Sequence, residues 1–124
     1  MARMGFCTEP AWDPDRLAVA DSGAIHAICH VRGGGEMGYA WHEGGRRASK
    51  PNSFSDLVAC ARCLRQSGLA KASAIAVEGR SAGGLLVGAA INLAPDAFGV
   101  AVAGVPFVDV MGARRALSSP SPRP

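Results

Sequence analysis

The 124-residue sequence predicts an α/β fold in which parallel strands alternate with helices. Two observations favour this class: apolar runs of strand length recur along the chain, and the segments between them carry apolar residues at helical spacing. These intervening segments are long enough to be crossovers, which parallel strands require. We therefore expect a parallel βαβαβ core with helices on both faces.

A short helix and a buried strand are expected near the start of the chain. Asp13 can act as N-cap and Pro14 takes the first helical position, so a helix is predicted that ends at Gly23. The run AIHAICHV at 24–31 is almost continuously apolar rather than alternating. Because strands buried on both faces have this pattern, we expect residues 24–31 to form a strand in the middle of the sheet.

A long helix is expected in the middle of the chain, with Asn52 or Ser53 as its N-cap and Gly68 as its stop. Its apolar residues recur at helical spacing: Phe54, Leu57, Val58, Ala61 and Leu64. This spacing places them on one stripe, which we expect to face the core.

The second half of the chain continues the alternation. Residues 73–77 predict the second strand, residues 82–94 the second long helix, and the segment 99–108 contains the third strand. The composition then changes to Pro, Ser, Ala and Arg without periodicity. We therefore expect a folded domain at 1–111 and a disordered tail at 112–124.

The charge of the chain argues against a nucleic-acid surface. The formal net charge is +3, but the last residues hold three of the 13 Lys and Arg residues: Arg114, Arg115 and Arg123. Without them the basic residues equal the 10 Asp and Glu. No apolar run approaches the roughly 18 residues of a membrane span, and the N-terminal segment lacks the apolar region of a secretory leader. We expect a soluble, cytoplasmic chain that binds neither nucleic acid nor membranes.

The cysteines are expected to be reduced thiols, because nothing in the sequence indicates secretion: Cys7, Cys29, Cys60 and Cys63. Cys60 and Cys63 form a C-x-x-C pair, but the pair falls in the middle of a predicted helix and has no second ligand pair. We therefore expect no bound metal and interpret the cysteines as buried or half-buried structural thiols.

One serine lies between glycines at the spacing G-x-S-x-G: Gly79, Arg80, Ser81, Ala82 and Gly83. A strand is predicted before it and a helix after it, which is the arrangement of a nucleophile elbow. The glycines at 79 and 83 would let strand and helix approach each other while the serine takes a strained backbone angle. The Ala82 N–H would then face a developing oxyanion at the helix N-terminus. The pattern favours Ser81 as a nucleophile over an ordinary turn.

Five segments occur in the order and at the spacing of one known family: HVRGGGEMGYAWHEGG at 30–45, KPNSFSDLVACA at 50–61, EGRSAGGLLVGAAIN at 78–92, PDAFGVAVAG at 95–104 and VPFVDVM at 105–111. Together they resemble the catalytic domain of the prolyl oligopeptidase family, most closely its oligopeptidase B branch. The resemblance runs from about Gly5 to Met111.

The resemblance implies a partial α/β-hydrolase fold, a Ser-Asp-His triad, and hydrolysis of short peptides after Lys or Arg. By motif, Ser81 matches the nucleophile of the family and the Ala82 amide matches one oxyanion donor. The family's β-propeller has no counterpart in this chain, and its oxyanion tyrosine falls at or before Met1. No histidine follows Ser81, and the acid and base of the family lie further downstream than Pro124. No cofactor is expected.

Two alternatives stay open at this point. The chain can be a truncated, catalytically inactive hydrolase fragment, because the Asp and His of the triad are missing. In the second alternative His30 or His42 replaces the missing base, since both are expected near the carboxyl edge of the sheet, although a structural role is favoured for each. Exposed sheet edges would in either case allow self-association.

The glycine-rich segment after the first predicted strand also has the outline of a dinucleotide-binding loop, G-x-G-x-x-G, at Gly33, Gly35 and Gly38. Such a loop needs a helix to open directly after it, because the helix N-terminus holds the pyrophosphate. Glycines and a proline interrupt the sequence that follows: Gly44, Gly45 and Pro51. We therefore do not expect a nucleotide cofactor.

Charged residues near this segment are expected to have structural roles. Arg32 and Glu36 flank the glycines, and we expect them to form an ion pair that braces the loop. Asp56 lies near the start of the long predicted helix, where a carboxylate is favoured by the helix dipole.

Overall fold

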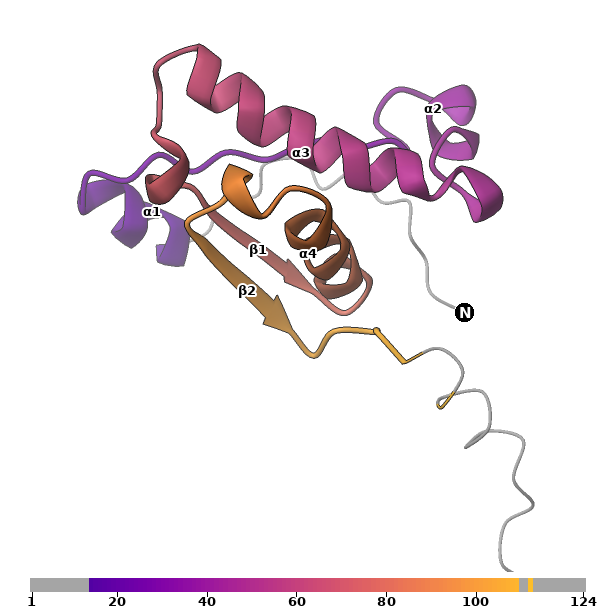
Figure 1. Cartoon of the computed structure of the whole chain (residues 1–124). Coiled ribbons are helices and arrows are strands. Elements are labelled where there is room, and N and C mark those ends of the chain that lie inside the picture. The colour runs from indigo at the N-terminus through magenta and orange to yellow at the C-terminus, as the bar shows by residue number, and fades with distance from the viewer. Residues whose placement is uncertain (1–13, 110–111, 113–124) are drawn as a thin grey trace, which may run out of the picture.

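The computed structural model of the chain describes residues 14–109 and residue 112 (Figure 1). The helices are α1 (Pro14–Asp21), α2 (Tyr39–Glu43), α3 (Pro51–Gln66) and α4 (Ala82–Leu93), and the strands are β1 (Ala76–Arg80) and β2 (Val100–Gly104). Short 3₁₀ turns lie at Arg47–Ser49, Ala72–Ala74 and Pro95–Ala97. Among the described residues, none of the helices is long and apolar enough to cross a membrane.

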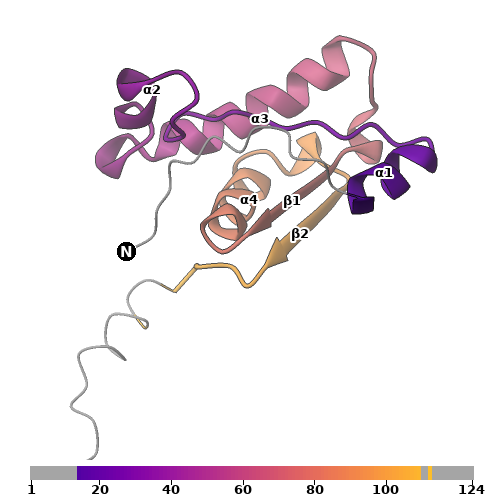
Figure 2. The same ribbon diagram turned by 180° about the vertical axis from the view of Figure 1, so that it is seen from behind.

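The two strands form a parallel pair that α4 connects. Their register runs from Ala76 opposite Val100 to Arg80 opposite Gly104. The helix α4 packs against both strands, and α3 packs against α4 (Figures 1 and 2). The α/β class and the parallel pairing are therefore as predicted.

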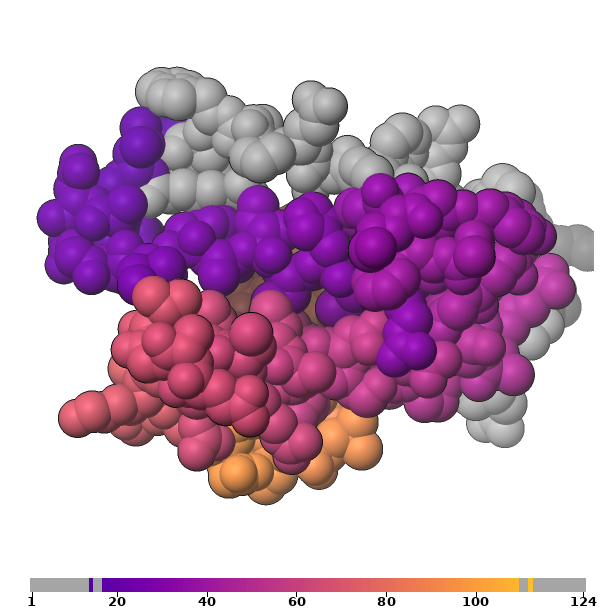
Figure 3. All heavy atoms as spheres, turned by 90° about the horizontal axis from the view of Figure 1, so that it is seen from above, coloured from indigo at the N-terminus to yellow at the C-terminus, as the bar shows by residue number. Residues whose placement is uncertain are grey.

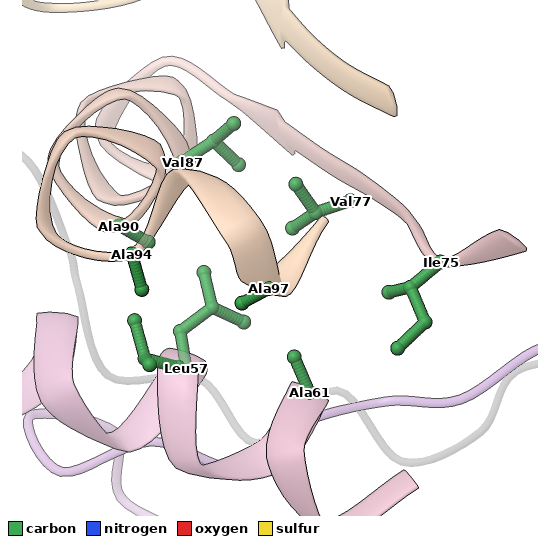
Figure 4. Packing of buried hydrophobic residues seen from close by; sticks show 9 residues of the cluster. Leu57, Ala61, Ile75, Val77, Val87, Ala90, Ala94 and Ala97 are labelled. Atoms are coloured by element: carbon green, nitrogen blue, oxygen red, sulfur yellow. The ribbon is translucent and has the colours of Figure 1, made fainter. Parts of the chain in front are cut away.

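The core lies between α3, α4 and β1. In α3, Leu57 points toward Ala94 of α4 and Ala61 points toward Ala97, and the side chain of Val77 faces the same space (Figure 4). Ala90 and Ala94 are almost fully buried. Small side chains at these positions let the two helices approach closely, and apolar burial of this kind stabilises by roughly 25 cal/mol per Å².

The first predicted strand is not part of the sheet. Residues 24–31 are extended, but they make no ladder with β1 or β2 and instead lie along α3 (Figures 1 and 2). In the space-filling view they form a continuous band that links α1 to the α2 region (Figure 3). An apolar run of this length predicts an extended backbone, but it does not predict which element the segment packs against. Here the Cys29–Cys60 disulfide and the ion pair of the adjacent Arg32 with Asp56 hold the segment on α3. The side chain of Ile25 stays 65% exposed.

The expected βαβαβ core is therefore a single βαβ unit within the described residues, and helices do not cover both faces of its sheet. Val77 points toward α4, and in a strand the neighbouring side chains point the other way. On that other face Val100 and Val102 of β2 are 55% and 49% exposed. The elements that pack on the sheet, α4 with α3 behind it, lie on one side (Figure 4).

Other boundaries of the elements also differ from those expected. The second predicted strand, 73–77, begins three residues later at Ala76, because Ala72–Ala74 form a 3₁₀ turn. The long helix begins at Pro51, so Asn52 and Ser53 lie inside it rather than capping it. Gly23 and Gly68 have φ of +89° and +75°, which suits glycine at the helix ends where they were predicted. Asp13, the domain boundary after 111 and the tail beyond residue 112 lie outside the described residues.

The cysteines correct the expectation of reduced thiols. Cys29 and Cys60 form a disulfide with a Cα–Cα distance of 6.3 Å. Cys63 is free and exposed rather than buried. The sequence did not indicate this pairing because it depends on where residues 24–31 lie, and the pattern predicted them in the sheet. Cys7 is outside the described residues.

Candidate active site

Ser81 lies at the turn between the last residue of β1 and the first residue of α4. Its backbone angles are φ +56° and ψ −115°, a region that residues other than glycine rarely adopt. The residue is exposed and lies at the carboxyl end of the strand. This is the local geometry that the G-x-S-x-G spacing predicted.

The backbone of Ser81 is fixed by the segment that follows β2. Its N–H donates to the carbonyl oxygen of Gly104 at 2.9 Å, and its carbonyl oxygen accepts the N–H of Phe107 at 3.2 Å. Val105 lies between these two partners and has φ of +40°, an unusual value for a β-branched residue. Two strained residues are therefore held against each other by hydrogen bonds.

Gly79 and Gly83 contribute to the turn in different ways. A Cβ on Gly79 would overlap the carbonyl group of Gly83 and approach Val87 Cγ2 to 2.9 Å. A Cβ on Gly83 would meet nothing within 4 Å. The expectation that both positions must lack a side chain is therefore correct for Gly79 and wrong for Gly83, whose contribution is its backbone.

A third glycine, which the sequence reasoning missed, brings α4 close to the segment after β2. A Cβ on Gly84 would lie 2.8 Å from both Cα and Cβ of Pro106. Gly84 itself is buried. The only signal in the sequence was the second glycine of the A-G-G run, which is not part of the G-x-S-x-G pattern.

The Ala82 N–H is available to an acceptor above the turn. Ala82 is the first residue of α4, so its N–H has no partner inside the helix, and Ser81 offers no side-chain cap. Amide groups at a helix N-terminus stabilise negative charge. Ala82 can therefore donate to an oxyanion that forms beside Ser81.

The histidines form contacts within the glycine-rich loop. His42 Nδ1 lies 2.9 Å from the carbonyl oxygen of Gly33, and His30 Nδ1 lies 3.4 Å from Glu36 Oε1. No hydrogen bond joins either imidazole to Ser81 within residues 14–109. This arrangement agrees with the structural role favoured for both, and His26 is exposed.

The two aspartates after Ser81 are also engaged elsewhere. Asp96 follows the far end of α4 and lies 4.0 Å from Arg65, in an exposed ion pair. A helix of 12 residues is about 18 Å long, so Asp96 is remote from Ser81. Asp109 accepts the N–H of Gly112 at 2.7 Å.

The glycine-rich loop is attached to α3 by an ion pair other than the one expected. Arg32 donates from Nε to Asp56 Oδ2 at 2.8 Å and from Nη2 to Oδ1 at 2.6 Å, and its backbone N–H also donates to Asp56. These hydrogen bonds hold the pKa of Asp56 below its usual value and raise the pKa of Arg32. Glu36 instead pairs with His30. Asp56 therefore binds the loop rather than simply stabilising a helix end.

Polar groups of α3 and of α2 complete this attachment. The Ser53 hydroxyl, which is fully buried, donates to the Arg32 carbonyl oxygen, and Asn52 Nδ2 donates to the Gly44 carbonyl oxygen at 2.8 Å. Trp41 Nε1 donates to the Val31 carbonyl oxygen at 3.1 Å. These three side chains connect the loop to its own ends and to the helix.

The geometry does not suit a dinucleotide loop. The helix after Gly38 has only 5 residues, and loop amides are already used internally: Gly33 N–H donates to Trp41 and Gly34 N–H to Val31. No group of three metal-ligating side chains occurs in the described part of the chain.

The strand, the strained serine and the helix with its free N-terminal amide define the central part of an α/β-hydrolase. The chain belongs to the prolyl oligopeptidase family, because the model of that family, described as "Prolyl oligopeptidase family", matches residues 11–119.

Individual relatives agree with this assignment. The chain is 43% identical to Protease 2 of Moraxella lacunata over 107 aligned residues. The aligned region is 86% of this chain and 16% of that protein. Oligopeptidase B from Trypanosoma brucei, solved with covalently bound antipain, has a TM-score of 0.64 and 61% identity over 66% of this chain and 12% of its own. Prolyl oligopeptidase B from Galerina marginata has a TM-score of 0.81 and 40% identity over 86% of this chain and 16% of its own. The chain thus spans less than one fifth of these relatives.

Proposed function

We propose that this chain is the nucleophile-bearing part of a serine-type peptidase, with Ser81 as the nucleophile. The observation that supports this proposal most strongly is the backbone of Ser81, which has φ of +56° between β1 and α4. A strained serine at this position exposes its hydroxyl while the rest of the turn is rigid. Membership of a peptidase family adds independent support.

Each group of the turn has a defined part in the reaction. Ser81 Oγ attacks the carbonyl carbon of the peptide bond, and the negative charge that develops on the carbonyl oxygen is stabilised by the Ala82 N–H. The tetrahedral intermediate then expels the amine, which leaves with the proton that the Ser81 hydroxyl lost, and water hydrolyses the acyl group that stays on Ser81. Gly79 and Gly84 keep α4 in place so that the amide faces the serine.

For substrates we propose short peptides with Lys or Arg before the cleaved bond. The support is the resemblance to oligopeptidase B, to which the chain is 61% identical over the compared residues. The identity to prolyl oligopeptidase B of Galerina marginata is 40% over a longer part of the chain. Cleavage after proline is therefore the competing specificity.

A second proposal is that the 124-residue polypeptide is inactive by itself. His42 contacts the Gly33 carbonyl oxygen and His30 pairs with Glu36, and within residues 14–109 no hydrogen bond joins these histidines or the exposed His26 to Ser81. A serine hydroxyl without a base is a poor nucleophile. The cytoplasmic location expected from the sequence stays a prediction.

A chimeric enzyme tests the proposed function. In Protease 2 of Moraxella lacunata, the segment that matches this chain over 107 residues is exchanged for the residues of this chain. We expect the folded chimera to cleave short substrates with Lys or Arg before the scissile bond faster than those with Pro, and Ser81→Ala to abolish both activities. Loss of activity in a chimera with native circular dichroism would argue against the functional assignment, and faster cleavage after Pro would argue against the specificity.

A further inference from the structure

Three cysteine residues lie together where the extended segment 24–31 crosses α3. Cys29 of this segment is bonded to Cys60 of the helix, across a sequence separation of 31 residues. Cys63 is three residues further along the same helix, and its thiol is free and exposed. The cluster therefore contains one disulfide and one available nucleophile.

Helix geometry brings Cys63 and Cys60 to the same side of α3. Residues three apart in a helix have Cβ atoms about 5–6 Å from each other, whereas a disulfide needs Cβ atoms about 3.5–4.5 Å apart, so the turn must tighten slightly for the bond to form. Cys63 lies in the last turn, where its carbonyl oxygen accepts the N–H of Ser67 at 2.9 Å. A terminal turn can tighten toward 3₁₀ geometry at small cost, which would bring the two sulfurs within bonding distance.

The disulfide is the main link between the N-terminal part of the described chain and the remainder. The hydrogen bonds at the end of α1 and in the turn after it, over residues 18–24, are local. Among residues 17–30, the other polar link to the rest of the described chain is the contact of His30 with Glu36 at 3.4 Å, and this histidine is 47% exposed. Breaking the Cys29–Cys60 bond would therefore loosen this part selectively.

We propose that Cys63 is the resolving thiol of a disulfide switch. The Cys63 thiolate attacks Cys60 Sγ, a new Cys60–Cys63 bond forms, and the Cys29–Cys60 bond breaks. The electron pair of the broken bond leaves on Cys29 Sγ, which takes up the proton that Cys63 lost. The exchange has no net change in oxidation state and requires no other reactant.

The two disulfide states differ in whether the segment 24–31 is covalently attached to α3. In one state the segment 24–31 is covalently attached to α3, and in the other the disulfide lies within the helix and constrains only one turn. The glycine-rich loop stays attached in both, because Arg32 binds Asp56 and Ser53 binds the Arg32 carbonyl oxygen independently of the cysteines. The switch therefore acts on the segment before Arg32, residues 17–30, and leaves the Ser81 turn unchanged.

Peptide mapping distinguishes the two disulfides directly. A Cys7→Ser chain is equilibrated in a glutathione redox buffer, its free thiols are blocked with N-ethylmaleimide, and it is digested with trypsin. Cleavage after Arg62 separates the two helix cysteines, so the peptides 17–32, 48–62 and 63–65 each carry one cysteine. The Cys29–Cys60 bond joins 17–32 to 48–62, whereas the Cys60–Cys63 bond joins 48–62 to 63–65.

We expect both linked pairs, with populations within roughly tenfold of each other. Cys63→Ser should leave only the Cys29–Cys60 pair, and Cys29→Ser only the Cys60–Cys63 pair. Thermolysin should cut before Ile25 or Ile28 several-fold faster in Cys29→Ser than in Cys63→Ser. The proposal is wrong if Cys63 is fully blocked while Cys29 and Cys60 remain paired, or if the peptides carry no disulfide. Equal thermolysin rates in the two variants would also overturn it.

Discussion

The backbone N–H of Ser81 donates to the carbonyl oxygen of Gly104 at 2.9 Å, and this hydrogen bond connects the turn after β1 to the end of β2. The strained φ of Ser81 is therefore supported by the neighbouring strand as well as by the helix that follows. A strained residue persists only where its surroundings fix it. The same contact explains why the segment after β2 must be close to α4, an approach that Gly84 permits.

Substitution of the turn glycines Gly79 and Gly83 by alanine should have different effects on stability. In Gly79→Ala the new methyl group overlaps the Gly83 carbonyl group, so we expect a loss of about 1–3 kcal/mol in the free energy of unfolding. Gly83→Ala is the control: its methyl group meets open space and alanine favours helix, so stability should stay equal or rise by up to about 1 kcal/mol. Urea denaturation followed by circular dichroism measures both. Equal losses in the two variants would show that the turn is packed differently.

The stability of the chain should fall on acidification because of Asp56. Hydrogen bonds from Arg32 lower its pKa in the folded state, whereas an unfolded Asp has a pKa of about 3.9. The stabilising contribution is then fully present above the unfolded-state pKa and is lost as the pH falls through the folded-state pKa. We expect Asp56→Asn to reduce the dependence of the unfolding free energy on pH between about 5 and 3. Asp96→Asn, in an exposed pair with Arg65, is the control and should leave the dependence unchanged.

The chain of residues 1–124 should associate with itself. One face of the sheet exposes Val100 and Val102, and exposed apolar side chains that lie together favour association with other chains. We expect oligomers or aggregates at micromolar concentration, measured by light scattering, and less association in Val102→Lys. A monomeric mass together with a sharp, reversible unfolding transition would contradict this expectation.

By itself the same chain should not hydrolyse peptides. Loss of the serine–histidine pair in a triad enzyme costs on the order of 10⁶ in turnover. We expect no measurable cleavage of short substrates with Lys or Arg, and no labelling of Ser81 by a fluorophosphonate. Cleavage that disappears in Ser81→Ala would reveal a base among these residues, and His30→Ala and His42→Ala would identify it.

The sequence predicted the Ser81 turn well because that turn is a local structure. The glycine spacing and the apolar residues on both sides determine it within a few residues, and α4 and β2 lie where their patterns indicate. Gly83 is the exception, since spacing alone cannot tell a required glycine from one that has open space beside it.

Features that depend on distant contacts were not predicted from the sequence. Residues 24–31 have the composition of a central strand but lie along α3, and the Cys29–Cys60 bond follows from that position. Arg32 was expected to bind Glu36, four residues away, and binds Asp56, 24 residues away, because the loop folds back on the helix. Hydrophobic periodicity carries no information about such partners.

The central claim is that Ser81 is the nucleophile, and the most direct test is to map a fluorophosphonate adduct on the Protease 2 chimera. After labelling and digestion, mass spectrometry locates the modified residue. We predict a single adduct on Ser81, blocked by a short peptide aldehyde inhibitor and absent in Ser81→Ala. A folded chimera that carries no adduct, or one whose labelling is unchanged in Ser81→Ala, would contradict the claim.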